Sequence, residues 1–235
     1  SRGEFESAIK ELNIVLNKDP DHYEANRHLG LIKLESDDLE EAEKLFIKSL
    51  KRHSSGFESL TNLARLNIIK DDLVKAEKFL EKSYKINRNY LATLLNFCDV
   101  YFRINNKEKF LQFSIDAMKL APKDPMTISK YSKALIVNSR EEEAIEILEK
   151  LCAEYPVHDF LLSLSHAYLI TGNIDKSNTI INNIFLQNDK NVDVFIEFTK
   201  NKKNRLDEKQ VKFFEDFCKD PNNPIDYKVT VCEGL

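Results

Sequence analysis

The residues that could do chemistry are scattered along the chain and form no known catalytic or metal-binding pattern. The sequence contains neither of the glycine-rich phosphate-binding motifs G-x-x-x-x-G-K and G-x-G-x-x-G, and it lacks the nucleophile motif G-x-S-x-G. His22 and His28 are not at the i, i+4 spacing that places two metal ligands on one helix face, and His53, His158 and His166 are isolated. We therefore expect no catalytic residue, no metal site and no cofactor within this chain.

The cysteines also lack a functional spacing. Cys98, Cys152, Cys218 and Cys232 form neither the C-x-x-C pair of a zinc or redox site nor the dense pattern of a disulfide scaffold. A free cysteine commonly behaves as a small buried hydrophobe. We expect reduced thiols and a cytoplasmic protein.

Charge and hydropathy argue against two classes of partner. The chain has 35 basic and 39 acidic residues, interspersed, for a net charge of −4, whereas nucleic-acid binders usually carry a basic excess. A basic cluster near residue 203 lies at a predicted helix end, where cations are favoured anyway. No apolar stretch is long enough to span a bilayer, and no signal-like segment opens the sequence. We expect neither a nucleic-acid partner nor a membrane partner.

The amino-acid composition indicates which secondary structure carries any functional surface. Charged residues make up 31% of the chain and hydrophobic residues 42%, with only 5 Gly and 6 Pro. This is too apolar for disorder and too poor in turn-forming residues for a protein of many strands. The expected fold class is all-α.

An internal repeat of 34 residues is the strongest signal. Pairs of a large and a small residue recur along the chain at Leu29-Gly30, Leu63-Ala64, Phe97-Cys98, Tyr131-Ser132 and Leu164-Ser165. Alanine recurs at Ala8, Ala42, Ala76 and Ala144, and turn-forming residues recur at Asp37, Asp71, Asn105, Ser139 and Gly172. Small side chains let two helices cross closely, and most of the turn residues tolerate a left-handed conformation after a helix.

This pattern resembles the tetratricopeptide repeat, whose units are pairs of antiparallel helices. The resemblance implies a right-handed α-solenoid over residues 1–205, with a half repeat over 1–22 and a last first helix over 192–205. Between them we expect repeats over 23–56, 57–90, 91–124, 125–157 and 158–191. An amphipathic helix over 206–221 and the start of a truncated helix over 222–235 are expected to follow, so we interpret the chain as a fragment of a longer protein.

One position departs from the pattern. Phe110 stands where the other repeats have alanine or serine, opposite Cys98. Either this helix pair is spread apart or the ring is turned outward. At the C-terminal end, Phe213, Phe214 and Phe217 would make a poor polar cap for a solenoid unless something covers them.

The resemblance also implies where a partner binds, because the first helices of successive repeats line a concave groove in this family. The matching positions carry polar side chains, namely Arg27, Asn62, Arg65, Asn96, Asp99, Arg103, Lys130, Lys133 and His166. Arg65, Asn96, Lys130 and Lys133 resemble the carboxylate clamp of chaperone-binding members. The match is partial, because Thr61 and Met126 stand where the family has basic residues and Arg65 where it has asparagine.

The expected function is therefore a scaffold that binds a partner protein or peptide in this groove, the partner bearing an acidic group or a C-terminal carboxylate. A second hypothesis is that the chain is the non-catalytic, substrate-selecting arm of a larger enzyme, such as a glycosyl- or sulfotransferase. A third is self-association through apolar ends, such as the face of Phe5, Ile9 and Leu12.

Overall fold

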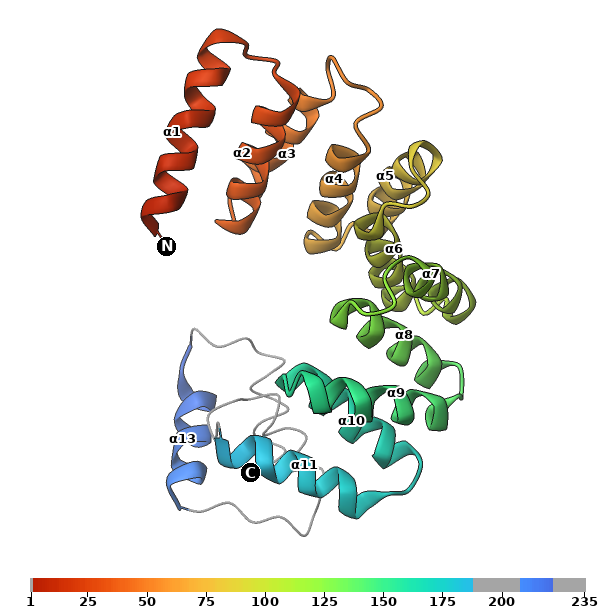
Figure 1. Ribbon diagram of the computed structural model, residues 1–235. Helices are drawn as coiled ribbons and strands as arrows, with labels where there is room; N and C mark the ends of the chain where they lie inside the picture. The colour runs from red at the N-terminus through yellow and green to blue at the C-terminus, as the bar shows by residue number, and fades with distance from the viewer. Residues whose placement is uncertain (1, 188–207, 222–235) are drawn as a thin grey trace. The chain divides into compact units, whose positions relative to one another are not determined.

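The computed structural model describes residues 2–187 and 208–221, and these residues form helices joined by short loops (Figure 1). No strand occurs among them, which confirms the all-α prediction. The helices are α1 (Arg2–Lys18), α2 (Tyr23–Glu35), α3 (Leu39–Ser49), α4 (Phe57–Ile69), α5 (Leu73–Ile86), α6 (Leu91–Arg103), α7 (Lys107–Leu120), α8 (Pro125–Val137), α9 (Glu141–Glu154), α10 (His158–Ile170), α11 (Ile174–Gln187) and α13 (Glu208–Lys219).

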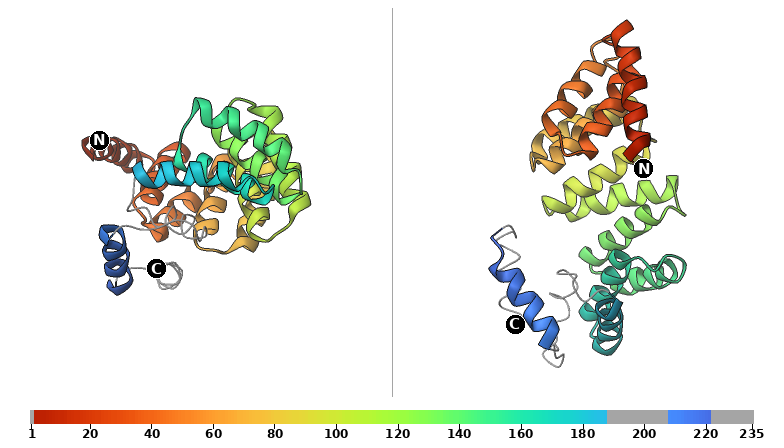
Figure 2. Two further views of the ribbon diagram at one scale, coloured as in Figure 1. Left: turned by 90° about the horizontal axis from the view of Figure 1, so that it is seen from below. Right: turned by 90° about the vertical axis from the view of Figure 1, so that its left-hand side faces the viewer.

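The chain divides into two compact units, residues 1–134 and 135–235, with the boundary inside α8. In the first unit, α2 packs on α3, α4 on α5 and α6 on α7, and each pair packs on the next pair along the chain. Figure 2 shows this stacking of α1 to α7 from two further directions. In the second unit, α10 packs against both α9 and α11. Each unit therefore consists of helix pairs that contact their neighbours in chain order.

The turns inside the helix pairs have the left-handed backbone that the sequence predicts. Asp37, Asp71, Asn105 and Ser139 have φ between 56° and 61°, and Gly172 has φ of 78°. The residue after three of these turns then caps the next helix, since the side chains of Asp38, Asp72 and Asn106 accept hydrogen bonds from backbone amides of the first turn. Each pair of adjacent turn residues thus ends one helix and begins another.

Small residues stand where the paired helices cross. A Cβ atom added to Gly30 would lie 2.7 Å from the Phe46 ring, so α2 and α3 approach as closely as they do because position 30 has no side chain. Ala64 of α4 and Ala76 of α5 are both fully buried. The prediction that small side chains allow close helix crossing is confirmed at these positions.

Phe110 does not turn outward. Its side chain is only 3% exposed, and its ring centroid lies 5.4 Å from that of Phe102. The alternative of an outward ring is therefore wrong. Cys98, fully buried on α6, is the small residue of this pair, and the ring packs inside the repeat under the cover of Phe102.

Helix α13 lies in the segment for which the sequence predicts an amphipathic helix. Phe214 is completely buried in a cluster with Ile181 and Ile184 of α11, and Phe213 and Phe217 pack against the same cluster. The aromatic face of α13 is therefore covered within its own unit. The helices predicted over 192–205 and 222–235 lie outside the described residues.

Candidate functional site

The first helices of successive pairs in unit 1 lie side by side in register. The Asn96 side chain on α6 donates to the Thr61 carbonyl on α4 (Nδ2 to O, 3.4 Å), and seven residues further on Arg103 donates to the Ile68 carbonyl (Nη1 to O, 2.9 Å). Both bonds join residues 35 positions apart, so α4 and α6 run in the same direction. An ion pair between Asp99 and Lys130, which are 31 positions apart, joins α6 to α8.

Because of this register, residues one repeat apart form rows across the three helices. Arg65 on α4, Asp99 on α6 and Lys133 on α8 are successive members of one row, which we call the Arg65 row. Arg65 and Lys133 are exposed, and the Asp99 side chain is 42% exposed. The row therefore presents a cation, a carboxylate and a cation on the surface of the first helices.

The cations predicted to line a groove fall into two groups. Arg27 pairs with Glu24 of its own helix (Nη2 to Oε2, 2.6 Å), Lys130 with Asp99, and Arg103 with the Ile68 carbonyl and with Asp71 at 3.4 Å. The side chains of Arg65 and Lys133 make no hydrogen bond or ion pair with any other described residue. The free positive charge of the predicted groove thus belongs to the two ends of the Arg65 row.

The remaining predicted groove residues, Asn62 and His166, form no hydrogen bond with each other. Asn62 is half-buried on α4 and His166 is exposed on α10, which belongs to unit 2. Neither side chain bonds to another described residue. The apolar side chains near Arg65 on its helix include Ile69, which is 48% exposed.

Thr61 does not belong to the surface at all. Its side chain is 2% exposed, and its hydroxyl contacts those of Ser83 (2.9 Å) and Thr93 (2.8 Å) and donates to the Phe57 carbonyl at 2.8 Å. Ser83 and Thr93 lie 2.9 Å apart, so three hydroxyls from α4, α5 and α6 form one buried cluster. Thr61, which stands where the resembled family has a basic residue, is therefore part of a buried junction between repeats.

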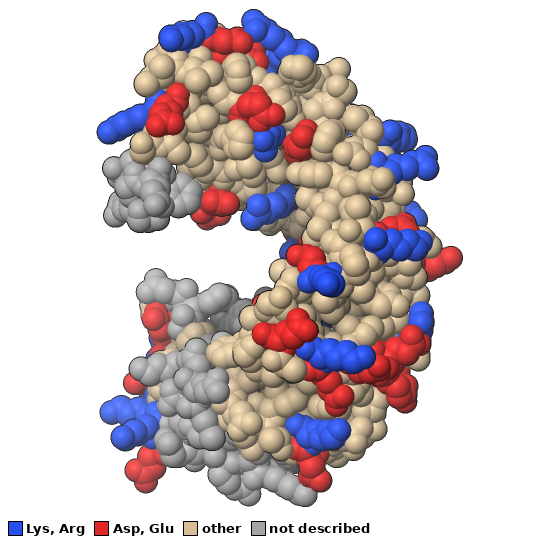
Figure 3. Space-filling model, viewed as in Figure 1, with Lys and Arg blue, Asp and Glu red and all other residues tan. Residues whose placement is uncertain are grey.

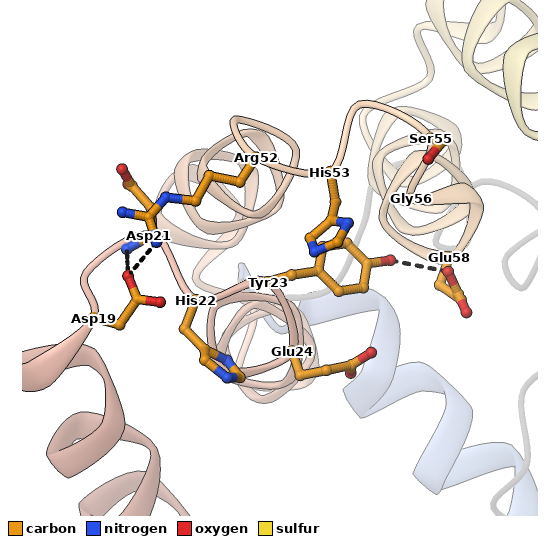
Figure 4. A pocket seen from close by; sticks show the side chains of 10 residues that line it. All are labelled: Asp19, Asp21, His22, Tyr23, Glu24, Arg52, His53, Ser55, Gly56 and Glu58. Atoms are coloured by element: carbon orange, nitrogen blue, oxygen red, sulfur yellow. Dashed lines mark hydrogen bonds and ion pairs between the residues drawn. The ribbon is translucent and has the colours of Figure 1, made fainter.

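A pocket of about 530 Å³ lies where the α1–α2 and α3–α4 loops meet the starts of α2 and α4 (Figure 4). The Tyr23 ring packs edge-on against His53, with centroids 5.2 Å apart, and a Cβ on Gly56 would meet Tyr23 at 2.5 Å. Sequence reasoning missed this pocket because its residues come from two loops and share no motif.

The acidic side chains of this pocket are all engaged. Asp19 pairs with Arg52 at 2.9 Å, Asp21 with Lys51 at 3.6 Å and Glu24 with Arg27. Glu58 accepts a hydrogen bond from the Tyr23 hydroxyl at 2.9 Å. Burial raises the pKa of Tyr23, and the Glu58 carboxylate beside its hydroxyl raises it further. The pocket is a polar junction whose charges already have partners.

Other chemistry is not evident in the part of the chain that the structure describes. No cluster of three or more His, Cys, Asp or Glu residues there could hold a metal ion. None of the helices found there is both long and apolar enough to cross a membrane. On the face of unit 1 visible in Figure 3, basic and acidic side chains alternate without a large patch of one sign.

Comparison with known proteins supports a repeat protein. The tetratricopeptide-repeat family model matches residues 57–90, and no curated protein sequence matches the chain. Among solved structures, a chain of the Cut9–Hcn1 hetero-tetramer of the APC/C aligns with all of this chain at a TM-score of 0.80 and 14% identity. This chain spans 47% of that one, about half its length.

Two further structures show the same fold. A tetratricopeptide repeat protein from Parabacteroides merdae aligns with 99% of this chain and 93% of its own, at a TM-score of 0.76 and 17% identity. YrrB, described as a tetratricopeptide protein with an unusual peptide-binding site, aligns with 74% of this chain and 90% of its own, at a TM-score of 0.59 and 14% identity. At these identities the likeness shows the fold. With the helix pairs in sequential contact, the chain has the tetratricopeptide-repeat fold, and its residues 57–90 match the tetratricopeptide-repeat family.

Proposed function

We propose that the chain is an interaction scaffold whose first helices in unit 1 bind a segment of another protein that carries acidic groups. The observation that carries this proposal is the difference among the surface cations. Arg103 and Lys130 already bind groups on neighbouring helices, whereas Arg65 and Lys133 are exposed with no such bond to a described residue. Acidic groups of a partner can pair with these two side chains without breaking a contact inside the repeats.

Two further features support binding of a polypeptide over a small anion. The half-exposed Ile69 lies one helical turn beyond Arg65 and offers an apolar contact beside the cation. A guanidinium pairs with a carboxylate through two parallel hydrogen bonds, which favours acidic side chains or a C-terminal carboxylate as its ligand. Among proteins of this fold, YrrB is described as having a peptide-binding site.

The experiment is a selection of peptide ligands on the intact chain. A displayed library of random peptides of about a dozen residues is selected on the wild-type protein, and the recovered peptides are synthesised and tested against Arg65→Glu and Lys133→Glu. The recovered sequences should be enriched in Asp and Glu, and each reversal should weaken their binding about fivefold or more, since it replaces an attractive contact with a repulsive one.

The matched control is Lys78→Glu, which makes the same charge change at an exposed position of the second helix α5. Wild-type affinity is expected for this variant. If the recovered peptides bound Arg65→Glu and Lys133→Glu as tightly as they bind the control, the proposed surface would be wrong.

A further inference from the structure

The geometry of the Arg65 row specifies how the acidic groups of a bound segment are arranged, an inference that rests on the proposed function. Arg65 and Lys133 occupy equivalent positions on α4 and α8, with α6 between them. Packed helices lie about 8–10 Å apart, axis to axis, so the two helices are separated by roughly 16–20 Å, and the two cations have the same spacing when their side chains extend in parallel. In that arrangement one carboxylate does not reach both of them.

The middle of the row does not attract a second anion. Asp99 lies between the two cations, and its charge is balanced by Lys130, whose side chain is only 16% exposed. The exposed part of the Asp99 carboxylate repels an acidic side chain placed over it and accepts a hydrogen bond from a polar one. The row therefore selects a segment with acidic residues at two separated points and a neutral or donor residue between them.

An extended segment that crosses the helices converts this distance into a sequence spacing. Extended chain advances about 3.3 Å per residue and turns every second side chain to the same face, so residues i and i+6 lie about 20 Å apart on one face. Residues i and i+2 span only about 7 Å, and residues i and i+5 face opposite sides. A spacing of six residues fits the row best.

We propose that the partner segment is extended, crosses α4, α6 and α8, and presents two acidic side chains six residues apart, one to Arg65 and one to Lys133. The residues that lie over Asp99, two to four positions after the first acidic residue, are neutral or hydrogen-bond donors. The recognition is thus bipartite, and it differs from the capture of a single carboxylate at one point of a groove.

The test uses short fluorescein-labelled peptides of Gly, Ser and Thr with two Glu residues at i and i+2, at i and i+5, or at i and i+6. Binding to the full chain is measured by fluorescence anisotropy at low ionic strength, because exposed ion pairs are screened by salt. The i, i+6 peptide should bind about three- to fivefold more tightly than the other two, which corresponds to one additional exposed ion pair.

A charge swap provides the specific readout. The double variant Arg65→Glu/Lys133→Glu should lose this preference, and it should bind a peptide with two Lys residues at i and i+6 more tightly than one with Lys at i and i+2. Lys78→Glu should behave as the wild type does. Restoration by the swapped peptide would also show that the double variant is folded.

The outcomes separate the inference from the proposed function. If the peptides bind in an Arg65-dependent way but all three spacings give equal affinity, the bipartite arrangement is wrong and the proposed surface stands. If no peptide shows binding that depends on Arg65 or Lys133, both proposals are overturned.

Discussion

Two neighbouring helix pairs in unit 1 share a backbone plan but use different side chains to hold their helices together. In residues 57–90, α4 and α5 cross at Ala64 and Ala76, and the junction with α6 is a cluster of buried hydroxyls around Thr61. In residues 91–124, α6 and α7 cross at Cys98 and Phe110. The Phe97 ring there stacks on Phe113 (4.2 Å) and on Tyr101 (5.7 Å), and Tyr84 of α5 packs edge-on against it.

The difference shows that a helix pair of this fold can bury a phenylalanine at the position where the neighbouring pair has an alanine. Where both residues are small, the space at the junction is filled by short polar side chains that hydrogen-bond to one another. Where one is a phenylalanine, its buried ring contacts Phe102, and an aromatic cluster forms around Phe97 of the same helix pair. The packing of each pair follows from its own set of side chains, while the turn geometry stays the same.

The largest effect is expected for Phe97→Ala, because Phe97 lies at the centre of the aromatic cluster and is 2% exposed. Truncating a buried phenylalanine typically costs about 3–5 kcal/mol, and the loss should appear in urea denaturation followed by circular dichroism. Leu63→Ala, at the equivalent position of α4, is the comparison variant. A loss below about 1 kcal/mol for Phe97→Ala would show that the aromatic cluster does not hold the pair together.

Exchanging the crossing residues should harm both pairs. Ala76→Phe should destabilise the chain by about 1–3 kcal/mol, since the site is fully buried and overpacking displaces its neighbours. Phe110→Ala should also destabilise it by a similar amount or more, about 2–4 kcal/mol, because the ring is buried and its removal leaves a cavity. A higher melting temperature for Phe110→Ala would contradict the packing described for this ring.

The hydroxyl cluster predicts a smaller loss. Thr61→Val keeps the shape of the side chain but removes the hydroxyl that contacts Ser83 and Thr93 and donates to the Phe57 carbonyl. Leaving buried polar partners unsatisfied should cost about 1–2 kcal/mol. Thr179→Val serves as the control, because the exposed Thr179 hydroxyl donates to the Asp175 carbonyl of its own helix α11 and belongs to no such cluster. Equal stability of Thr61→Val and the wild type would argue against the cluster.

The smallest expected effect is a pH dependence of the free energy of unfolding, which arises from Cys98 in the pair of α6 and α7. Burial raises the pKa of Cys98 to about 12, above its ordinary value of 9.0, so the folded state keeps the thiol proton at a pH at which the unfolded chain loses it. This contribution to stability is present below pH 9 and is lost as the pH rises toward 12. The free energy of unfolding should fall by about 1 kcal/mol between pH 8 and pH 10 from this group alone.

The variant Cys98→Ala introduces the residue type found at position 64. It should remove the part of the decrease in the free energy of unfolding that comes from the Cys98 thiol. The check is urea denaturation of both proteins over this pH range. Parallel pH profiles for the two proteins would show that Cys98 does not contribute to the decrease.

The sequence predicts the features that depend on local backbone and residue size. Asp37, Asp71 and Asn105 take the left-handed conformation because their side chains tolerate it, and the crossing points at Gly30 and Ala64 follow from their size. These properties belong to single positions or to a fixed period, so a repeat pattern reveals them.

Side-chain contacts between helices were not predictable in the same way. The burial of Thr61, the inward packing of Phe110 and the ion pair between Asp99 and Lys130 depend on which rotamers neighbouring helices permit. For the same reason the sequence could name candidate groove cations but could not separate Arg65 and Lys133 from those bound within the protein. The pocket beside Tyr23 depends on two loops that only the fold brings together.

The most direct test of the proposed binding surface is a double-mutant cycle between Arg65 and the acidic residue of the i, i+6 peptide that faces it. Affinities are measured for wild type and Arg65→Ala, each with the parent peptide and with peptides in which either Glu is replaced by Gln. Contact between the two charges predicts a coupling energy of about 0.5–1 kcal/mol for one of the two Glu residues. Coupling energies indistinguishable from zero for both would contradict the proposal that Arg65 binds the partner.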